Sequence, residues 1–213
     1  MTRHEHSFRN VDELQQLFVE RKSAIRQRLT EFASVKQEDL YYELAYCLLT
    51  PQSSAVNAAL TIDALRKAGF HTREMDPVAI ISSKAHYIRF HNTKARRLEE
   101  AKRIFPQVAA ELSNGSTAPE LRDWLVEHVK GFGWKEASHF LRNIGHRDLA
   151  ILDRHILRNL VRHGVIRSIP KSLTQKRYIA IEGRFAAFAS HIGISMDELD
   201  LLFWSRETGE ILK

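Results

Sequence analysis

The chain of 213 residues contains a single cysteine, Cys47. One cysteine cannot form an internal disulfide bond, a cysteine-ligated iron–sulfur cluster or a zinc site built on several cysteines. Such a chain gains nothing from an oxidising compartment, so we expect a cytoplasmic protein. Cys47 shares an apolar helical face with Leu44 and Leu48, which predicts an inert residue of the core.

Long hydrophobic runs are also absent. No stretch reaches roughly 18 apolar residues, the length that a transmembrane helix requires. The first ten residues, MTRHEHSFRN, have no apolar segment of the kind that a secretory signal carries. We therefore expect neither a membrane span nor a signal peptide.

Alternating apolar and polar residues, the pattern of a half-buried strand, are scarce, and repeats and low-complexity segments are missing. Apolar residues instead recur at spacings of three and four, which predicts an all-α fold. Helices are expected over residues 11–33, 38–49, 53–68, a short one from 76, 92–104, 117–131, one from 135, 154–163, 174–190 and 195–209. Capping boxes are expected at three helix starts, in the pairs Asn10–Glu13, Thr117–Glu120 and Ser195–Glu198.

Acidic residues are fewer than basic ones, 26 against 32, and the formal net charge is +6. A basic chain without a membrane signal is a candidate for binding a polyanion such as nucleic acid. Lysines scattered over an ordinary soluble enzyme give the same balance. Charge alone therefore leaves the partner open.

A Gly-x-Gly turn lies between two expected helices, in the segment KGFGWK at residues 130–135. Glycine permits positive φ angles and exposes backbone N–H groups, here at Gly131 and Gly133. These groups and the start of the next helix form an anion site suited to a phosphate, and Lys130 adds positive charge. A phosphate contact would position the protein on nucleic acid without reading its sequence. An ordinary connection between helices with a glycine cap fits the segment equally well.

Lys135 stands at the start of the following helix. The positive end of the helix dipole disfavours a charged amine there, and so favours the neutral form that acts as a nucleophile. Covalent catalysis by Lys135 is one interpretation. A simple contact between its charged amine and a DNA phosphate is the other.

Asp153 directly precedes another expected helix. Aspartate is a preferred N-cap residue, and this is its ordinary role at such a position. A cap residue has a fixed position and one carboxylate oxygen to spare, so a second role is compatible with it. A carboxylate facing a sugar C1′ atom would stabilise the positive charge that develops as a glycosidic bond breaks.

The run VKGFGWKEASHFLRNIG…LAILDRHI resembles the hairpin and following aspartate of the helix–hairpin–helix DNA glycosylase superfamily. In that superfamily a lysine at the position of Lys135 marks members that are both glycosylase and lyase, and nearly all members share the aspartate at Asp153. The segments LLTPQSS (48–54), RFHNTKARRL (89–98) and DLLFWSRETGEILK (200–213) are similar to the compact archaeal-type 8-oxoguanine DNA glycosylase/lyase subfamily. The resemblance covers most of the chain.

This resemblance implies a mechanism. The damaged nucleotide is flipped out of double-stranded DNA into a pocket. Lys135 attacks C1′, expels 8-oxoguanine and forms a Schiff base, after which elimination cleaves the strand on the 3′ side of the lesion. Asp153 stabilises the sugar cation and assists the proton transfers. The resemblance implies no cofactor, no metal and a monomeric protein, and we expect it to be nucleoid-associated.

The resemblance also implies residues that recognise the base. Trp204 and Lys213 help to form the pocket, and Phe90 stacks on the flipped base. Gln52, in the loop after Pro51, contacts a base edge or the gap that the lesion leaves. By residue type alone, Trp204 could pack in the core, Phe90 is more often a core residue, and Lys213 would be a frayed terminus.

Two lobes with a cleft between them are implied as well. Residues 35–144 form a lobe that carries the hairpin and Lys135, while residues 1–34 and 145–213 form a lobe that carries Asp153. Two alternatives remain open at this point. The chain could be a non-catalytic helix–hairpin–helix DNA-binding protein, or the same class of enzyme acting on another damaged base, such as an oxidised pyrimidine or a mismatched base.

Overall fold

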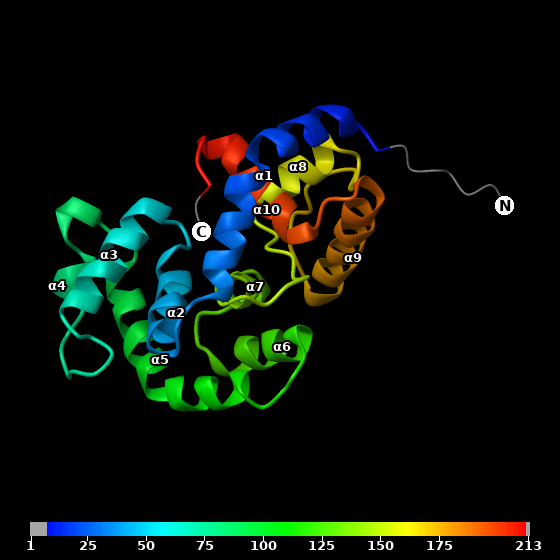
Figure 1. The fold of residues 1–213 in the computed structure, drawn as a ribbon. Coiled ribbons are helices and arrows are strands. Elements are labelled where there is room, and N and C mark those ends of the chain that lie inside the picture. The colour runs from blue at the N-terminus through cyan, green and yellow to red at the C-terminus, as the bar shows by residue number, and fades with distance from the viewer. Residues whose placement is uncertain (1–7, 212–213) are drawn as a thin grey trace. The chain divides into compact units, whose positions relative to one another are not determined.

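The computed structural model describes residues 8–211, and all regular secondary structure within that range is helical (Figure 1). The all-α prediction is confirmed. The helices are α1 (Val11–Ala33), α2 (Leu40–Leu49), α3 (Ala55–Lys67), α4 (Val78–Ile81), α5 (His91–Leu112), α6 (Ala118–His128), α7 (Trp134–Asn143), α8 (Arg154–Arg162), α9 (Gln175–Ile192) and α10 (Met196–Thr208). Two short 3-10 helices, η1 (Gln37–Asp39) and η2 (Lys84–His86), precede α2 and α5. In the described residues, no helix has the length and hydrophobicity needed to cross a bilayer.

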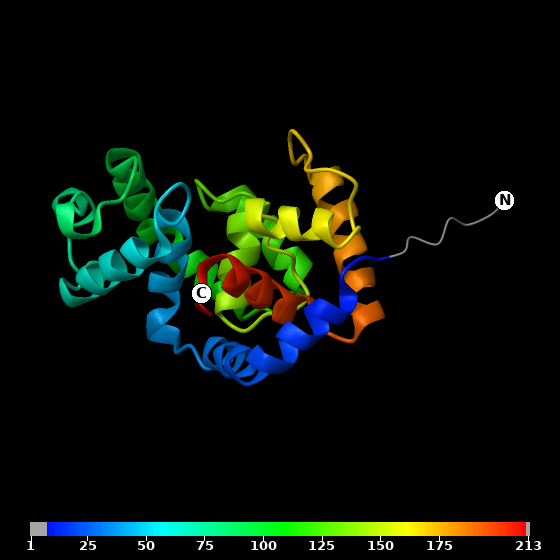
Figure 2. The same ribbon diagram turned by 90° about the horizontal axis from the view of Figure 1, so that it is seen from above.

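The chain divides into two compact units. The terminal unit comprises Met1–Ala33 and Gly145–Lys213, and the central unit comprises Ser34–Ile144. The terminal unit thus joins segments from opposite ends of the sequence. Figures 1 and 2 show α1 alongside α10 within it.

The core of the terminal unit is formed where α1 meets α10. Apolar residues of α1 at helical spacing are buried on one stripe: Leu14, Phe18, Ile25, Leu29 and Phe32. Two arginines of the same helix then tie it to α10. Arg21 donates to the carbonyl of Ser205 at 2.6 Å, and Arg26 donates to the carboxylate of Glu198 at 2.9 Å.

The core of the central unit is built around α2. Its residues from Tyr41 to Leu49 are all buried, and α3, α5 and α7 pack against it. A helix that is apolar on all sides is stable only when neighbouring elements cover all of its faces. Cys47 is fully buried on this helix, as the sequence predicted.

Helix α5 is longer than the sequence rules predict. The helix was expected to end near residue 104, yet it continues through Pro106 to Leu112. Proline in a helix interior costs about 3 kcal/mol. Burial of Phe105 and Val108, which extend the apolar stripe of Leu98, contributes about 1.5–3 kcal/mol for each side chain and offsets that cost.

The capping boxes expected at Thr117 and Ser195 are present, each closed by a glutamate three residues later. The carboxylate of Glu13, expected to close a third box, instead accepts hydrogen bonds from Arg162 and Arg206. These ion pairs link α1 to both α8 and α10. They stabilise the packing of the terminal unit rather than the start of α1.

Candidate active site

The hairpin of the central unit consists of α6, a turn over residues 129–133, and α7. Gly131 has a φ angle of +101°, which side chains of L-residues rarely allow. A Cβ atom there would also lie 2.7 Å from Cδ of Arg97. The backbone geometry therefore favours glycine at this point of the turn, and any side chain there would also force Arg97 to move.

The second glycine, Gly133, is the N-cap of α7 and has an extended backbone. Its N–H group donates to Oε2 of Glu136 at 3.2 Å, which is one half of a capping box. The amide that the sequence assigned to a phosphate is thus held by a carboxylate in this structure. A phosphate that binds here must displace the side chain of Glu136.

Lys135 lies in the first turn of α7, as the sequence predicted, and its side chain is 26% exposed. Its Nζ atom is 3.5 Å from Oε1 of Glu136. Glu136 therefore contacts both the hairpin amide and the lysine amine. Movement of this one carboxylate would open the anion site and release the amine together.

Lys130, in the turn, forms an exposed ion pair with Glu100 at 3.0 Å. Its side chain is 74% exposed, and an ion pair of this kind contributes at most about 1 kcal/mol. The pair is therefore weak enough for a phosphate to compete for the Lys130 amine.

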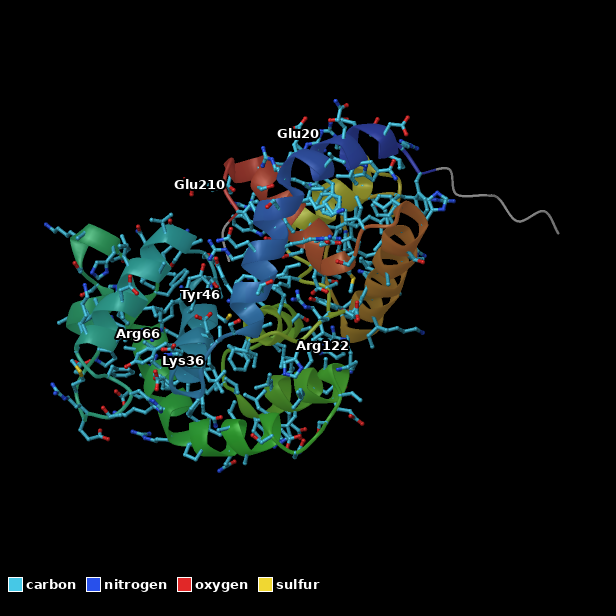
Figure 3. The ribbon with its side chains drawn as sticks, viewed as in Figure 1. Glu20, Lys36, Tyr46, Arg66, Arg122 and Glu210 are labelled. Atoms are coloured by element: carbon cyan, nitrogen blue, oxygen red, sulfur yellow. The ribbon has the colours of Figure 1, made fainter. Side chains whose placement is uncertain are left out.

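The two hairpin helices are braced by Arg122 of α6, which is labelled in Figure 3. Its guanidinium carbon lies 4.2 Å from the ring centroid of Trp134, a cation–π distance. The same guanidinium donates to the hydroxyl of Ser138 on α7 at 3.3 Å. These contacts fix the angle between α6 and α7, and with it the conformation of the turn.

Two of the predicted base-recognition residues have strained backbones in the central unit. Gln52 and Phe90 have φ angles of +57° and +61°, a conformation that costs about 1–3 kcal/mol for a residue with a side chain. Phe90 is 52% exposed, so the alternative that it is a core residue is wrong. Gln52 is exposed as well. Both side chains are available to a ligand.

Lys94 was not singled out by the sequence analysis, which gave only a helix over its segment. The residue is only 2% exposed. Burial, together with the nearby positive charges of Arg97 and Lys135, lowers the pKa of Lys94 to about 8. The available signal was its spacing, because Lys94 stands four residues before Leu98 and therefore on the apolar stripe of α5.

In the terminal unit, Asp153 is the N-cap of α8, as its residue type predicted. Its Oδ1 atom accepts from the backbone N–H groups of His155 and Ile156, both at 2.8 Å. The preceding loop is pinned by α9, since the hydroxyl of Tyr178 donates to Ala150 and accepts from the N–H of Leu152. The position of the carboxylate is therefore fixed from both sides.

Trp204 of α10 is partly buried. Its ring lies beside that of His155, with centroids 5.1 Å apart, and Nδ1 of His155 is 3.5 Å from the carboxylate of Glu207. Since the backbone of His155 also donates to Asp153, one residue contacts both predicted site residues of this unit. Lys213, the other predicted pocket residue, lies outside the described residues.

The structure thus groups the predicted residues by unit. The central unit holds Lys135, Gln52 and Phe90, and the terminal unit holds Asp153 and Trp204. That Lys135 and Asp153 meet at one cleft stays a prediction. Within residues 8–211, no group of three or more His, Cys, Asp or Glu side chains is arranged to hold a metal ion.

The model of the 8-oxoguanine DNA glycosylase family matches residues 25–194. The chain belongs to this family. An 8-oxoguanine DNA glycosylase/AP lyase of Fusobacterium nucleatum is 38% identical over 95% of this chain and 97% of its own length. The corresponding protein of the archaeon Korarchaeum cryptofilum is 37% identical over 90% of this chain and 91% of its own.

Solved structures of the family have the same fold. The 8-oxoguanine DNA glycosylase of Thermotoga maritima matches with a TM-score of 0.83, at 32% identity, over 95% of this chain and 98% of its own. The glycosylase/lyase of Methanocaldococcus jannaschii, in complex with a 15mer DNA containing 8-oxoguanine, matches with a TM-score of 0.85 over 95% and 99%. The family resemblance inferred from the sequence motifs is confirmed, including its archaeal members.

Proposed function

We propose that this protein is a bifunctional DNA glycosylase and AP lyase that excises 8-oxoguanine from double-stranded DNA. The observation that carries the proposal is a lysine in the first turn of the second hairpin helix, in a chain of the 8-oxoguanine DNA glycosylase family. Full-length relatives are named 8-oxoguanine DNA glycosylase/AP lyase, which supports both activities.

The chemistry follows from an amine nucleophile. Lys135 in its neutral form attacks C1′ of the flipped nucleotide, and the glycosidic bond breaks with its electron pair leaving on the base, which is then protonated. The resulting adduct opens to a Schiff base. Removal of a C2′ proton then expels the 3′ phosphate and cleaves the strand. No cofactor is needed, because the lysine forms the covalent intermediate itself.

Asp153 supplies fixed negative charge for this reaction. Positive charge develops on the sugar as the glycosidic bond lengthens, and a carboxylate held in place stabilises it without reorganising. The two hydrogen bonds that Oδ1 accepts from the start of α8 orient the group. Its role as a cap and its role in catalysis are therefore compatible.

The remaining residues bind the DNA. The turn at Gly131 and Gly133, with Lys130, holds a backbone phosphate once Glu136 turns away. Phe90 stacks on the flipped base or on its neighbours, and Gln52 contacts a base edge or the gap. Trp204 and Lys213 form the wall of the base pocket.

We further propose that the protein acts as a monomer at the nucleoid. A relative of similar length is in complex with DNA that contains 8-oxoguanine, which supports the choice of ligand. Because the hairpin, Lys135, Asp153 and the base-recognition residues all belong to one chain, a single copy supplies every residue of the proposed site.

Borohydride trapping tests the proposal, because reduction of the Schiff base links the protein covalently to its substrate. Duplexes containing 8-oxoguanine, thymine glycol, uracil or a G·T mismatch are incubated with the wild type, Lys135→Gln and Lys130→Gln. We expect trapping on 8-oxoguanine DNA by the wild type and by Lys130→Gln, and none by Lys135→Gln. Absence of any adduct with the wild type would support the non-catalytic alternative. Trapping on another lesion alone would mean that the protein acts on that lesion and not on 8-oxoguanine.

A further inference from the structure

The ammonium group of Lys94 is the centre of a hydrogen-bond cluster in the central unit. Its Nζ atom donates to the carbonyl of Leu49 at 2.6 Å, to the carbonyl of Pro51 at 2.7 Å and to the hydroxyl of Ser53 at 3.1 Å. These three acceptors surround Gln52 in sequence. A single buried charge therefore holds the loop that presents Gln52.

The same cluster reaches the segment that presents Phe90. The hydroxyl of Ser53 accepts a second hydrogen bond, from the backbone N–H of Arg89 at 3.1 Å. The backbone N–H of Lys94 itself donates to the carbonyl of Phe90 at 3.0 Å. Lys94 and Ser53 thus connect two segments that are far apart in the sequence.

Both segments need such an anchor. Gln52 and Phe90 have positive φ angles and exposed side chains, so neither is held by its own burial. A strained conformation persists only when the surrounding structure imposes it. Charge-assisted hydrogen bonds are roughly twice as strong as neutral ones, and three of them converge on this loop.

We propose that Lys94 is a positioning residue for base recognition, whose ammonium group fixes Gln52 and Phe90 together in the geometry that engages the lesion site. The proposal rests on the function proposed above. Lys94 does not touch the reacting atoms. It acts through the two loops that it holds.

The two activities separate this role from a general structural one. Excision of 8-oxoguanine requires the base to be flipped and held, and therefore depends on Gln52 and Phe90. Cleavage at an abasic site made in advance requires no base recognition, only Schiff-base formation by Lys135 and removal of the C2′ proton. Loosening the two loops should therefore slow excision and spare cleavage of the abasic strand.

The test compares three variants with the wild type. Lys94→Met keeps the length of the side chain and removes all of its donors, while Ser53→Ala removes only the link between the two loops. Lys102→Met is the matched control, because Lys102 lies on the same helix and donates to a different segment, at the carbonyl of Arg73 at 2.5 Å. Single-turnover excision is measured on 8-oxoguanine duplexes, and borohydride trapping on a duplex with an abasic site.

We expect Lys94→Met to slow excision by roughly tenfold to a hundredfold, the range for a misplaced contact, and to leave abasic trapping within about twofold. Ser53→Ala should lower excision in the same direction by a smaller factor, and it decides the matter if Lys94→Met does not fold. Lys102→Met should match the wild type. Fluorescence of 2-aminopurine placed beside the lesion should show impaired flipping in the first two variants only.

Equal loss of excision and abasic trapping, or unchanged excision in a folded Lys94→Met protein, would overturn the proposal. So would normal excision by Ser53→Ala if Lys94→Met cannot be prepared. If the wild type traps neither substrate, the proposed function fails first. The result for the wild type alone therefore distinguishes failure of the proposed function from failure of the role proposed for Lys94.

Discussion

The buried amine of Lys94 makes a prediction about stability that can be worked through from its pKa. Replacing it in Lys94→Met removes one titrating group from the core of the central unit. In the folded protein the pKa of Lys94 is lowered from 10.5 to about 8, first by burial and then by the charges of Arg97 and Lys135. Between these two values the unfolded chain binds more protons than the folded one.

Stability must therefore rise with pH through that window. Each pKa unit corresponds to about 1.4 kcal/mol, so Lys94 places a cost of about 3 kcal/mol on folding below pH 8. That cost is fully present at neutral pH and disappears as pH approaches 10.5. Between pH 7 and pH 10, about 2–3 kcal/mol of it is relieved.

Urea unfolding of the wild type and of Lys94→Met, at about pH 7 and about pH 10, measures this relief. The difference in unfolding free energy between the two proteins cancels the other titrating groups to a first approximation. It should shift by about 2–3 kcal/mol in favour of the wild type on going to the higher pH. Lys102→Met provides the control, and its difference from the wild type should change little.

A constant difference between wild type and Lys94→Met at the two pH values would refute this reasoning. It would mean that the amine titrates in the folded protein as it does in water. A shift in favour of the variant would also contradict it, because that sign requires a lysine whose charged form is stabilised by folding.

Two further predictions concern the site. Asp153→Asn keeps a good N-cap, so unfolding free energy should change by less than about 1 kcal/mol, while excision should fall roughly a hundredfold or more with the lost charge. Single-turnover kinetics and thermal unfolding check it, and unchanged excision would contradict it. Glu136→Gln keeps an acceptor for Gly133 and removes a carboxylate from the phosphate site, so DNA affinity should rise severalfold at low salt and converge with the wild type at high salt. Fluorescence anisotropy measures this affinity. The control is Glu120→Gln, which changes the glutamate at the same position of the preceding helix. An equal rise in DNA affinity in both variants would count against a phosphate site at the hairpin.

The fold was largely predictable because helices leave a local signal. Apolar spacing gave the all-α class, and the boundaries of α1 matched the prediction. The helix expected over residues 92–104 was too short, because the burial of Phe105 and Val108 that extends α5 past Pro106 shows only in the packed structure. The 3-10 helix η1 before α2 was not predicted, since no local sequence rule separates it from the helix that follows.

The site was predictable where residue type limits the possibilities. Asp153 stands directly before a helix, where aspartate is a preferred cap, and Gly131 has a positive φ angle that favours glycine. Glu136 was overlooked although it stands three residues after Gly133, the same spacing that identified the capping boxes. A capping box is recognised in sequence by the side chain of its cap residue, which glycine lacks, although a glycine cap can still donate its N–H group.

Lys94 and Glu136, the two residues that the sequence analysis missed, are both charged groups that hold backbone atoms of functional segments. A lysine at position 94 is unfavourable for stability. Its cost of about 3 kcal/mol is a large fraction of the free energy of unfolding of a typical domain, about 5–15 kcal/mol. An apolar side chain of the same length would be cheaper to bury. It could not, however, direct three hydrogen bonds at the loop around Gln52. The presence of an amine in that position is therefore explained by the geometry that it imposes on Gln52 and Phe90, and not by the stability of the fold.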